Sequence, residues 1–408
     1  MGFTSYRFPK NERGWNERSY RFLKATLIRS ANFMFNPTVV NEHNMPTTGP
    51  CFIFGNHANN FDPFILNVHL NDEPTAGVMT RDQFHRFIPA LCMDSVGIVP
   101  TSKYVPDPSV IRNVMKMVDQ KRMIVIYPEG GRRWDGRPKS VIESTMKLFW
   151  KIGIPVHPVE THGSYVGWPR WASFPRRNRT RLVFRDPLIP SNFDSYDSFY
   201  EACMEAMNFH EETPPAESTP FWTHKPAAGI EKLLYKCPIT GVQDAVWSPD
   251  GQKVLSKAAP EFEYRMNTLS QLVDGYGQAF TLSPFYDKVK TFPMQLDANG
   301  LLIDEPRAYL YQIDRRFNRR GLSWTRAWIH PDHIGFQVGG STNRVPLQDI
   351  RYVSIEQNSR ITLTMDEMTW EIVLTTTRAL QWQDTIQRLQ HFELPEPVQI
   401  PFGSEIRI

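Results

Sequence analysis

Cysteine is scarce in this sequence. Only four cysteines occur among the 408 residues, and their positions are too scattered for the paired spacing of a disulfide framework. Sparse cysteines of this kind are typical of proteins that fold in a reducing compartment. We therefore expect no disulfide among Cys51, Cys92, Cys203 and Cys237.

Long hydrophobic runs are missing as well. No apolar segment approaches the about 18–20 residues that a membrane-spanning helix needs. The opening "MGFTSYRFPKNERGW" lacks the apolar core of a secretory signal, and Tyr6 stands where a myristoylation signal requires Ser or Thr. These absences predict a protein that is cytoplasmic or that is held at a membrane surface without spanning it. We expect a cytoplasmic protein that associates peripherally with the inner face of the membrane.

Neither sign of charge dominates. The 46 basic and 43 acidic residues leave a net charge of +3, which is too small to indicate a nucleic-acid partner. With 41% hydrophobic and 22% charged residues, the chain has the composition of a globular protein with a substantial core. Its length predicts about two to three domains.

Residues 16–36 have the pattern of a basic amphipathic helix. Such a helix either lies in a membrane interface or packs as a surface helix on its own domain, and the sequence leaves both open. We assign residues 1–45 to this N-terminal segment. The expected apolar stripe comprises Phe22, Leu23, Leu27, Ile28 and Phe33, with Arg18, Arg21, Lys24 and Arg29 among and around it.

Short apolar runs alternate with helical patterns in residues 46–210. Strands that alternate with helices in this way predict an α/β layer domain. The strand-like runs are "CFIF" (51–54), "MIVI" (123–126), "IPVHPV" (154–159) and "RLVF" (181–184), and the helical ones are residues 108–121 and 143–153.

The pattern changes after this domain. The proline-rich "EETPPAESTP" predicts a linker over residues 211–228. Residues 301–408 contain short strands with one buried face, such as "RITLTM" and "TWEIVLTT", followed by a helix at 377–392. This β-rich segment predicts a small sandwich or barrel, and it resembles a pleckstrin-homology or GRAM-type domain.

The stretch "FGNHANNFDPF" (54–64) contains a histidine and an aspartate five residues apart. On a regular helix this spacing separates the side chains by about 140°, so they would not meet. They meet if His57 lies in the turn after a strand and Asp62 belongs to the next segment. The carboxylate would then accept a hydrogen bond from Nδ1–H and leave Nε2 as a base. The pair alone does not distinguish catalysis from an ordinary loop.

Three further segments carry polar groups next to apolar strands. "VIYPEGGRRWDG" (125–136) combines two glycines with two arginines, a composition that allows the backbone and guanidinium groups to grip a phosphate. The alternative is a glycine-rich loop with solvated arginines. "VGIVPTSK" (96–103) ends in a lysine, and "IGIPVHPVETHGSY" (152–165) ends in a polar loop.

These four blocks, in this order, resemble the glycerolipid acyltransferases, the 1-acylglycerol-3-phosphate acyltransferase family. Asn56, His57 and Asp62 match Asn-His-x-x-x-x-Asp, and "YPEGGRR" matches Phe-Pro-Glu-Gly-Thr-Arg-Ser. "IPVHPV" matches the family's Ile/Val-Pro-x-x-Pro-Val strand, and residues 97–103 match its Gly-x-x-Phe-x-x-Arg block loosely. The four blocks cover residues 50–165.

The resemblance implies a mixed sheet flanked by helices and an O-acyltransferase of phospholipid biosynthesis or remodelling. A fatty acyl group would pass from acyl-CoA or acyl carrier protein to a lysophospholipid hydroxyl, without metal or other cofactor, because the thioester is already activated. His57 would be the general base, and Asp62 would orient it. The acceptor would be held by Asn56, Lys103, Glu129, Gly130, Gly131 and Arg132, and Pro155 would belong to the strand that backs the acyl or thioester site.

Four positions depart from the family pattern. Gly131 replaces the usual Thr, Arg133 the usual Ser, and Lys103 the usual Arg, while Asn59 stands where Ser is common. Lys103 keeps the charge but loses the planar fork of arginine. The departures leave the His57–Asp62 pair intact and leave the identity of the acceptor open.

A narrower resemblance is to a bacterial branch that carries a zinc ribbon after the catalytic domain. "THGSYVGWPRWA" and "GIEKLLYKCPITG" carry this resemblance. Of the Cys-Pro-x-Cys-Gly knuckle only Cys237 is present, with Thr240 at the second position. A structural zinc site needs about four ligands. We therefore predict a degenerate, metal-free ribbon over residues 229–300.

Other functions remain compatible with the sequence. The chain could be a lipid-binding protein with a retired active site, or an acyltransferase for glycerol-3-phosphate. A third interpretation makes His57, Asp62 and His162 the metal ligands of a hydrolase.

The stretch "GWPRWASFPRRNRTR" (167–181) has the composition of a membrane-docking surface. Aromatic residues at the headgroup level beside arginines favour an anionic bilayer. The alternative is that the tryptophans are buried and the arginines are paired. The residues concerned are Trp168, Trp171 and Phe174, with Arg170, Arg176, Arg177, Arg179 and Arg181.

Overall fold

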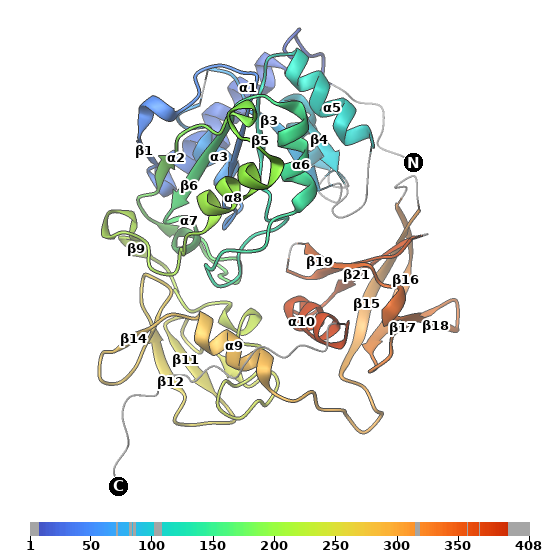
Figure 1. Cartoon of the computed structure of the whole chain (residues 1–408). Helices are drawn as coiled ribbons and strands as arrows, with labels where there is room; N and C mark the ends of the chain where they lie inside the picture. Colours follow the sequence, from blue (N-terminus) through green and yellow to red (C-terminus); the bar gives the residue numbers. More distant parts are fainter. Residues whose placement is uncertain are drawn as a thin grey trace. The chain divides into compact units, whose positions relative to one another are not determined.

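The chain divides into two compact units (Figure 1). The computed structural model describes residues 8–70, 72–80, 84, 87–101, 108–314, 319–356, 358–366 and 368–390. Unit 1 comprises Met1–Arg170, Phe174–Pro226 and Thr268–Ser270, and unit 2 comprises Trp171–Ser173, Ala227–Asn267 and Gln271–Ile408.

Unit 1 is built on a seven-stranded sheet of order β1-β8-β6-β2-β5-β3-β4. The strands β6, β2, β5, β3 and β4 run parallel, while β8 is antiparallel to β6 and parallel to β1. The predicted α/β class with a mixed sheet is therefore confirmed. The strands are β1 (Thr38–Val40), β2 (Cys51–Gly55), β3 (Ala76–Thr80), β4 (Ile98–Thr101), β5 (Met123–Ile126), β6 (Val156–His162) and β8 (Arg181–Phe184).

Helices cover both faces of this sheet. Both predicted helices of this domain are present, α5 (Pro108–Asp119) and α6 (Glu143–Ile152). Among the described helices, none combines the length and apolar character that a bilayer crossing requires. The remaining helices of unit 1 are α1 (Glu17–Leu23), α2 (Arg29–Phe35), α3 (Asp62–Leu66), α4 (Phe87–Ser95), α7 (Ser164–Gly167) and α8 (Tyr196–Met207).

The apolar run of β2 supplies a core on each side of the sheet, because successive strand side chains point to opposite faces. Phe52 and Phe54 pack in one cluster with Phe149 of α6. Ile53 packs in the other with Leu66 of α3. The end of β2 is thereby fixed from both sides, and the His57 loop starts from this rigid strand.

The predicted N-terminal helix is present, but its buried face differs from the predicted stripe. Leu23 and Ile28 are buried as expected, whereas Phe22 and Phe33 are 64% and 62% exposed. A π-helical segment, Lys24–Ile28, joins α1 to α2. Its turns hold more residues than those of an α-helix, so spacing counted across it assigns the wrong face to later residues. The buried positions are Tyr20, Leu23, Ile28, Ala31 and Phe35.

The proline-rich segment is not a linker. Unit 1 extends to Pro226, and Glu211 is fully buried within it. Strand β9 (Trp222–Thr223) pairs with β7 (Arg176–Arg177) as a small ribbon. The proline-rich composition correctly indicated that this segment is not a regular helix. It did not reveal that the segment packs on unit 1, because that packing depends on individual buried residues such as Glu211.

Unit 2 contains two antiparallel sheets. The first has five strands in the order β10-β11-β12-β13-β14, and α9 (Ser283–Thr291) follows it. The strands are β10 (Val246–Trp247), β11 (Lys253–Ser256), β12 (Glu263–Met266), β13 (Leu272–Val273) and β14 (Ala279–Phe280).

The second sheet of unit 2 has seven strands in the order β18-β17-β16-β15-β21-β20-β19. Helix α10 (Ala379–Gln390) follows it, with Trp382 fully buried. The predicted antiparallel strands and C-terminal helix are thus present. The strands are β15 (Ile303–Ile313), β16 (Arg319–Ile329), β17 (His333–Val338), β18 (Ser341–Pro346), β19 (Tyr352–Glu356), β20 (Arg360–Thr364) and β21 (Thr369–Leu374).

Candidate active site

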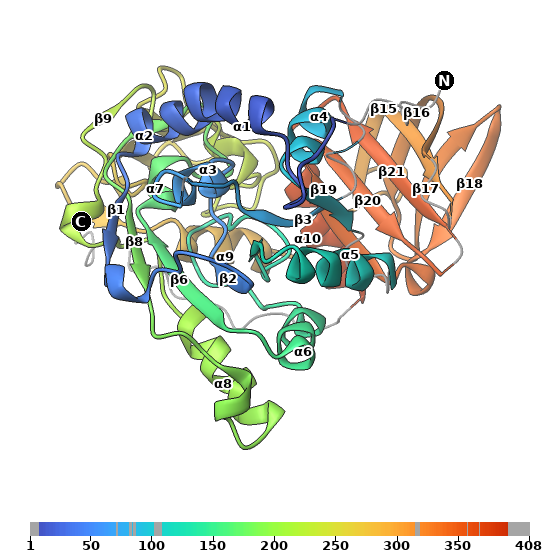
Figure 2. The same ribbon diagram turned by 90° about the horizontal axis from the view of Figure 1, so that it is seen from above.

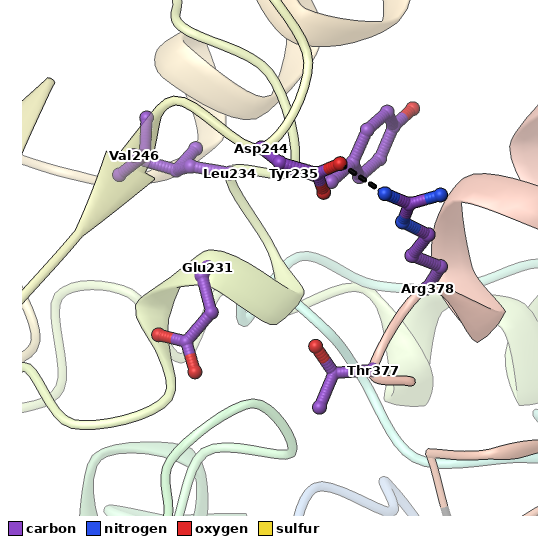
Figure 3. Close-up of a pocket in the computed structure, with 7 residues that line it drawn as sticks. All are labelled: Glu231, Leu234, Tyr235, Asp244, Val246, Thr377 and Arg378. Atoms are coloured by element: carbon purple, nitrogen blue, oxygen red, sulfur yellow. Dashed lines mark hydrogen bonds and ion pairs between the residues drawn. The ribbon is translucent and has the colours of Figure 1, made fainter. Parts of the chain in front are cut away.

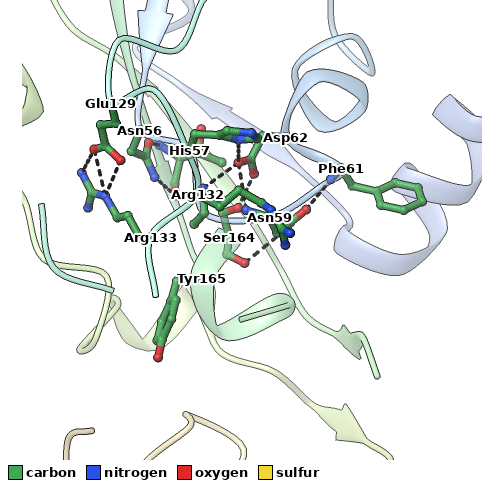
Figure 4. Close-up of polar contacts among 12 residues, drawn as sticks. Asn56, His57, Asn59, Phe61, Asp62, Glu129, Arg132, Arg133, Ser164 and Tyr165 are labelled. Atoms are coloured by element: carbon green, nitrogen blue, oxygen red, sulfur yellow. Dashed lines mark hydrogen bonds and ion pairs between the residues drawn. The ribbon is translucent and has the colours of Figure 1, made fainter. Parts of the chain in front are cut away.

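His57 and Asp62 lie within hydrogen-bond distance of each other (Figure 4). His57 occupies the loop after β2 and Asp62 begins α3, so the two side chains come from different segments, as their spacing required. Nδ1 of His57 is 2.8 Å from Oδ2 of Asp62. The His57 side chain is 23% exposed and that of Asp62 is 1% exposed. Nε2 makes no hydrogen bond within the described part of the chain, so it is available as a base.

The Asp62 carboxylate is held by three further donors. The backbone N–H groups of Ala58 and Asn59 donate to Oδ2 at 2.8 Å and 3.0 Å. The hydroxyl of Ser164 donates to Oδ1. With both oxygens fixed, the carboxylate cannot rotate freely, and it holds His57 in the tautomer with Nδ1 protonated.

The His57 ring stacks on Tyr127, which follows β5. Their ring centres are 4.6 Å apart and their planes differ by 20°. Burial raises the pKa of the Tyr127 phenol well above its ordinary value, and the nearby Asp62 carboxylate adds to this effect. Tyr127 therefore packs against His57 as an uncharged phenol and orients the plane of the imidazole ring.

The sheet explains why these distant segments meet. Strands β2, β5 and β6 are neighbours and run parallel, so their carboxyl ends lie at one edge. Loops that follow such ends form the usual ligand sites of open α/β sheets. His57, Glu129 and Ser164 follow these three strands in turn.

Asn56 is used inside the protein. Its side chain is fully buried, accepts a hydrogen bond from the N–H of Thr161 at 2.8 Å and donates to the Thr161 carbonyl at 3.3 Å. Asn56 also donates to the carboxyl group of Glu211. This geometry does not fit the expected contact with the acceptor. Instead, Asn56 joins the end of β2 to β6.

Glu129 is likewise paired within the protein. The guanidinium of Arg133 donates to it at 2.9 Å and 2.5 Å, and both side chains are fully buried. Burial alone would lower the pKa of Arg133, but the charge of Glu129 and its hydrogen bond raise this pKa above its ordinary value. The backbone N–H of Arg133 donates to the His57 carbonyl at 2.9 Å. The pair therefore fixes the loop against His57, and direct binding of the acceptor by Glu129 does not fit this arrangement.

Two departures from the family pattern thus have structural roles. Arg133 completes the buried pair with Glu129. Asn59 accepts from the N–H of Phe61 at 2.5 Å and donates to the Ser164 carbonyl at 3.2 Å, which shapes the loop between His57 and Asp62.

The remaining predicted residues of the glycine-rich loop are more accessible. Gly130 adopts a positive φ of 64°, and Gly131 is partly exposed. Arg132 is also partly exposed, and its carbonyl accepts a hydrogen bond from Arg170 at 3.4 Å. Their role in binding an acceptor stays a prediction.

Pro155 does not lie at the site. Its carbonyl accepts from Phe52 at 2.9 Å, near the amino ends of β6 and β2, whereas His57 follows the carboxyl end of β2. The opposite end of β6 reaches the site through Thr161. This position does not favour Pro155 as a residue behind the acyl or thioester site, and that role stays a prediction. Lys103 lies outside the described residues.

Three residues of the site were missed by sequence reasoning: Tyr127, Ser164 and Glu211. Glu211 accepts from the backbone N–H of Tyr165 at 3.2 Å as well as from Asn56. Burial raises its pKa well above the ordinary value, with Asp62 and Glu129 adding to the effect and Arg133 opposing it. No local pattern marks Glu211, because it stands within the proline-rich segment.

The proposed metal ligands of a hydrolase do not assemble. Nε2 of His162 is paired with Glu160 at 2.7 Å. Within the described residues, the one group that could hold a metal ion is His330, Asp332 and His333, in unit 2. It includes neither His57 nor Asp62.

The sequence stretch proposed to dock on membranes is largely interior. Trp171 is fully buried, and Arg170 and Arg176 are only 6% and 1% exposed. Arg176 donates to the carbonyls of Val166 and Pro226, and burial lowers its pKa to about 10. The predicted alternative therefore holds for the burial of these three residues, but Arg170 and Arg176 donate to carbonyl groups where Asp or Glu partners were expected.

A small pocket in unit 2 is separate from this site (Figure 3). The guanidinium of Arg378 pairs with Asp244 across it. The pocket contains no residue of the His57–Asp62 loop, and it is lined by Glu231, Leu234, Tyr235, Asp244, Val246, Thr377 and Arg378.

Parts of the chain are similar to proteins of known structure. One similar solved structure is the 1-acyl-sn-glycerophosphate acyltransferase PlsC from Thermotoga maritima, which is 17% identical in sequence. The match covers 46% of this chain and 78% of that chain, with a TM-score of 0.39. Another is the N-terminal PH domain of human ARAP2, which is 10% identical in sequence. That match covers 28% of this chain and 100% of that chain, with a TM-score of 0.20. Both TM-scores are too low to establish a shared fold.

No curated protein matches the chain. Residues 36–161 match the model of the family described as Acyltransferase. These residues include the His57–Asp62 pair and the Glu129–Arg133 pair, so the part of the chain that carries the candidate site is the part similar to that family.

Proposed function

We propose that unit 1 transfers a fatty acyl group from a thioester to the hydroxyl of a lysophospholipid. The observation that carries this proposal is the 2.8 Å contact between Nδ1 of His57 and Asp62, with Nε2 of His57 left available. The resemblance of the four sequence blocks to glycerolipid acyltransferases supports the choice of a thioester donor, acyl-CoA or acyl carrier protein, and of a glycerolipid acceptor.

In this mechanism Nε2 of His57 removes the proton from the acceptor hydroxyl. The hydroxyl oxygen attacks the thioester carbonyl carbon, an ester bond forms, and the carbon–sulfur bond breaks. The leaving thiolate takes the proton from the imidazolium. A positioned base of this kind contributes about 10²–10⁴-fold in rate.

Asp62 keeps Nδ1–H of His57 directed toward itself and stabilises the imidazolium that forms during attack. Ser164 and two backbone N–H groups hold Asp62 in place. The partly exposed Arg132 is proposed to grip the phosphate of the acceptor, since guanidinium forks bind phosphate oxygens well.

The test is an acyl-transfer assay with the purified full chain. Labelled oleoyl-CoA is incubated with a panel of lysophospholipids and with glycerol-3-phosphate, and products are separated by chromatography. Acylation of one lysophospholipid class is the expected result. Acylation of glycerol-3-phosphate alone would show that the acceptor is glycerol-3-phosphate and not a lysophospholipid. If no acceptor is acylated, with acyl-CoA or with acyl carrier protein as donor, the result would favour a retired lipid-binding protein.

A further inference from the structure

The large aromatic side chains that unit 1 exposes come from only two parts of the described chain. Phe22 and Phe33 belong to the N-terminal helical run, and the others to the segments around β7 and β9. The exposed fractions are 64% for Phe22, 62% for Phe33, 40% for Phe174, 55% for Phe221 and 54% for Trp222. Single exposed aromatics are ordinary, but such a concentration is not.

Contacts of Arg177 and His224, together with the strand pairing of β7 and β9, link four of these rings. The guanidinium of Arg177 lies 4.1 Å from the ring centre of Phe33 and 5.2 Å from that of Phe221. Arg177 also pairs with Trp222 across the β7–β9 ribbon.

The surface continues through His224. Its ring stacks on Trp222 at 6.5 Å and meets the edge of Phe174 at 5.0 Å. Helix α2 contacts β7, the strand that pairs with β9, and Figure 2 shows α2 and β9 on the same side of unit 1. We call this surface the aromatic patch, and it consists of Phe33, Phe174, Arg177, Phe221, Trp222 and His224.

The surroundings of the aromatic patch are cationic. The helical run over residues 17–35 contains four basic residues and one acidic residue, Glu17. Further exposed cations stand in the β7 and β9 segments. The exposed basic residues are Arg18, Arg21, Lys24 and Arg29 in the helical run and Arg179 and Lys225 in the β7 and β9 segments.

We propose that the aromatic patch docks unit 1 on an anionic bilayer surface. Amphipathic aromatic rings prefer the headgroup level of a bilayer. Each Lys or Arg near an anionic surface adds about 1 kcal/mol, so a handful of exposed cations holds a domain reversibly. A bilayer is preferred over a protein partner because exposed cations around exposed rings match an anionic interface.

The position of the patch suits a lipid acceptor, and this part of the inference rests on the proposed function. Phe35, at the end of α2, contacts Phe61 with ring centres 5.7 Å apart, and Phe61 directly precedes Asp62. The helix that carries Phe33 thus packs against the loop that carries the catalytic pair. Docking through the patch brings that loop close to the membrane.

The test compares two double variants with the same change of charge. Phe33→Glu/Trp222→Glu places two carboxylates in the aromatic patch. Ile111→Glu/Met115→Glu places two on α5, at apolar residues that are 55% and 42% exposed and lie outside the patch. Full-length proteins are floated with vesicles of equal phosphatidylglycerol and phosphatidylcholine, and circular dichroism checks that both variants are folded.

We expect the wild type and the α5 variant to float with the anionic vesicles and to bind pure phosphatidylcholine more weakly. The patch variant should bind the anionic vesicles about tenfold or more weakly. Equal losses in both variants, or a wild type that does not float, would overturn the proposal. A wild-type dimer that the patch variant converts to a monomer would show instead that a second copy covers the patch. Flotation needs no turnover, so an inactive protein that floats would refute the proposed function alone.

Discussion

The hydroxyl of Ser164 donates a hydrogen bond to Oδ1 of Asp62, although the two residues are 102 positions apart in the chain. Asp62 is thereby connected on one side to the His57 imidazole and on the other to the segment after β6. Ser164 touches no reacting atom in the proposed mechanism. It acts as a positioning residue that fixes the carboxylate which in turn fixes the base.

Ser164→Ala should lower kcat and leave the KM values of both substrates nearly unchanged. A hydrogen bond to a charged group contributes about 1.5–3 kcal/mol, which corresponds to about 10–100-fold in rate if it acts fully in the transition state. Ser218→Ala is the matched control, because Ser218 is also fully buried and its hydroxyl has no hydrogen-bond partner within the described residues. Equal kcat values for the two variants would show that Ser164 has no positioning role.

Substitutions of the neighbouring Arg132 and Arg133 should affect different properties, substrate binding for Arg132 and stability for Arg133. Arg133→Met leaves Glu129 buried without its partner and should reduce the free energy of unfolding by about 3–5 kcal/mol. Arg132→Ala should change stability little and raise KM for an anionic acceptor by about 10–100-fold, since a charge-assisted bond is lost. Urea unfolding and steady-state kinetics measure the two effects. Severe destabilisation by Arg132→Ala, or a normal stability of Arg133→Met, would contradict the assignment.

The raised pKa of Glu211 predicts a specific dependence of stability on pH. An unfolded glutamate titrates near about pH 4.3, and burial holds the folded pKa of Glu211 well above its ordinary value. Between these two values the folded protein binds more protons than the unfolded chain, so this group's contribution to stability is present below about pH 4.3 and falls as pH rises toward the folded pKa.

Glu211→Gln removes this titration. Its free energy of unfolding should therefore fall less than that of the wild type as the pH rises above about 4.3. Urea unfolding at several pH values measures the difference, and Glu201→Gln, at an exposed glutamate of α8, is the control. An unchanged pH dependence in Glu211→Gln would show that Glu211 does not take up a proton on folding.

Cys237 should hold no zinc. Burial alone would raise the pKa of the Cys237 thiol, but hydrogen bonds to the sulfur from Ser256 and Thr240 lower this pKa. Hydroxyl groups are not the thiolate or imidazole ligands of structural zinc sites. Elemental analysis of the wild type and of Cys237→Ser should show no zinc that depends on this residue. One zinc per wild-type chain that is lost in Cys237→Ser would refute the degenerate ribbon.

Strands, helices and the contact between His57 and Asp62 could be predicted from the sequence, because each depends on local periodicity or on a short motif. The buried partners could not. Ser164 and Glu211 reach the site through the order of strands in the sheet and through docking of an irregular segment, and neither leaves a local pattern. The position of Pro155 could not be predicted for a related reason, since a motif gives the identity of a strand but not which end of it reaches the site.

The most direct measurement is acyl transfer by His57→Ala. The variant should fold like the wild type, as judged by circular dichroism and urea unfolding, because the imidazole is partly exposed. Transfer of labelled oleate from oleoyl-CoA to the preferred lysophospholipid should fall by about 10²–10⁴-fold. A folded His57→Ala protein that acylates the lysophospholipid at the wild-type rate would contradict the catalytic role of the pair.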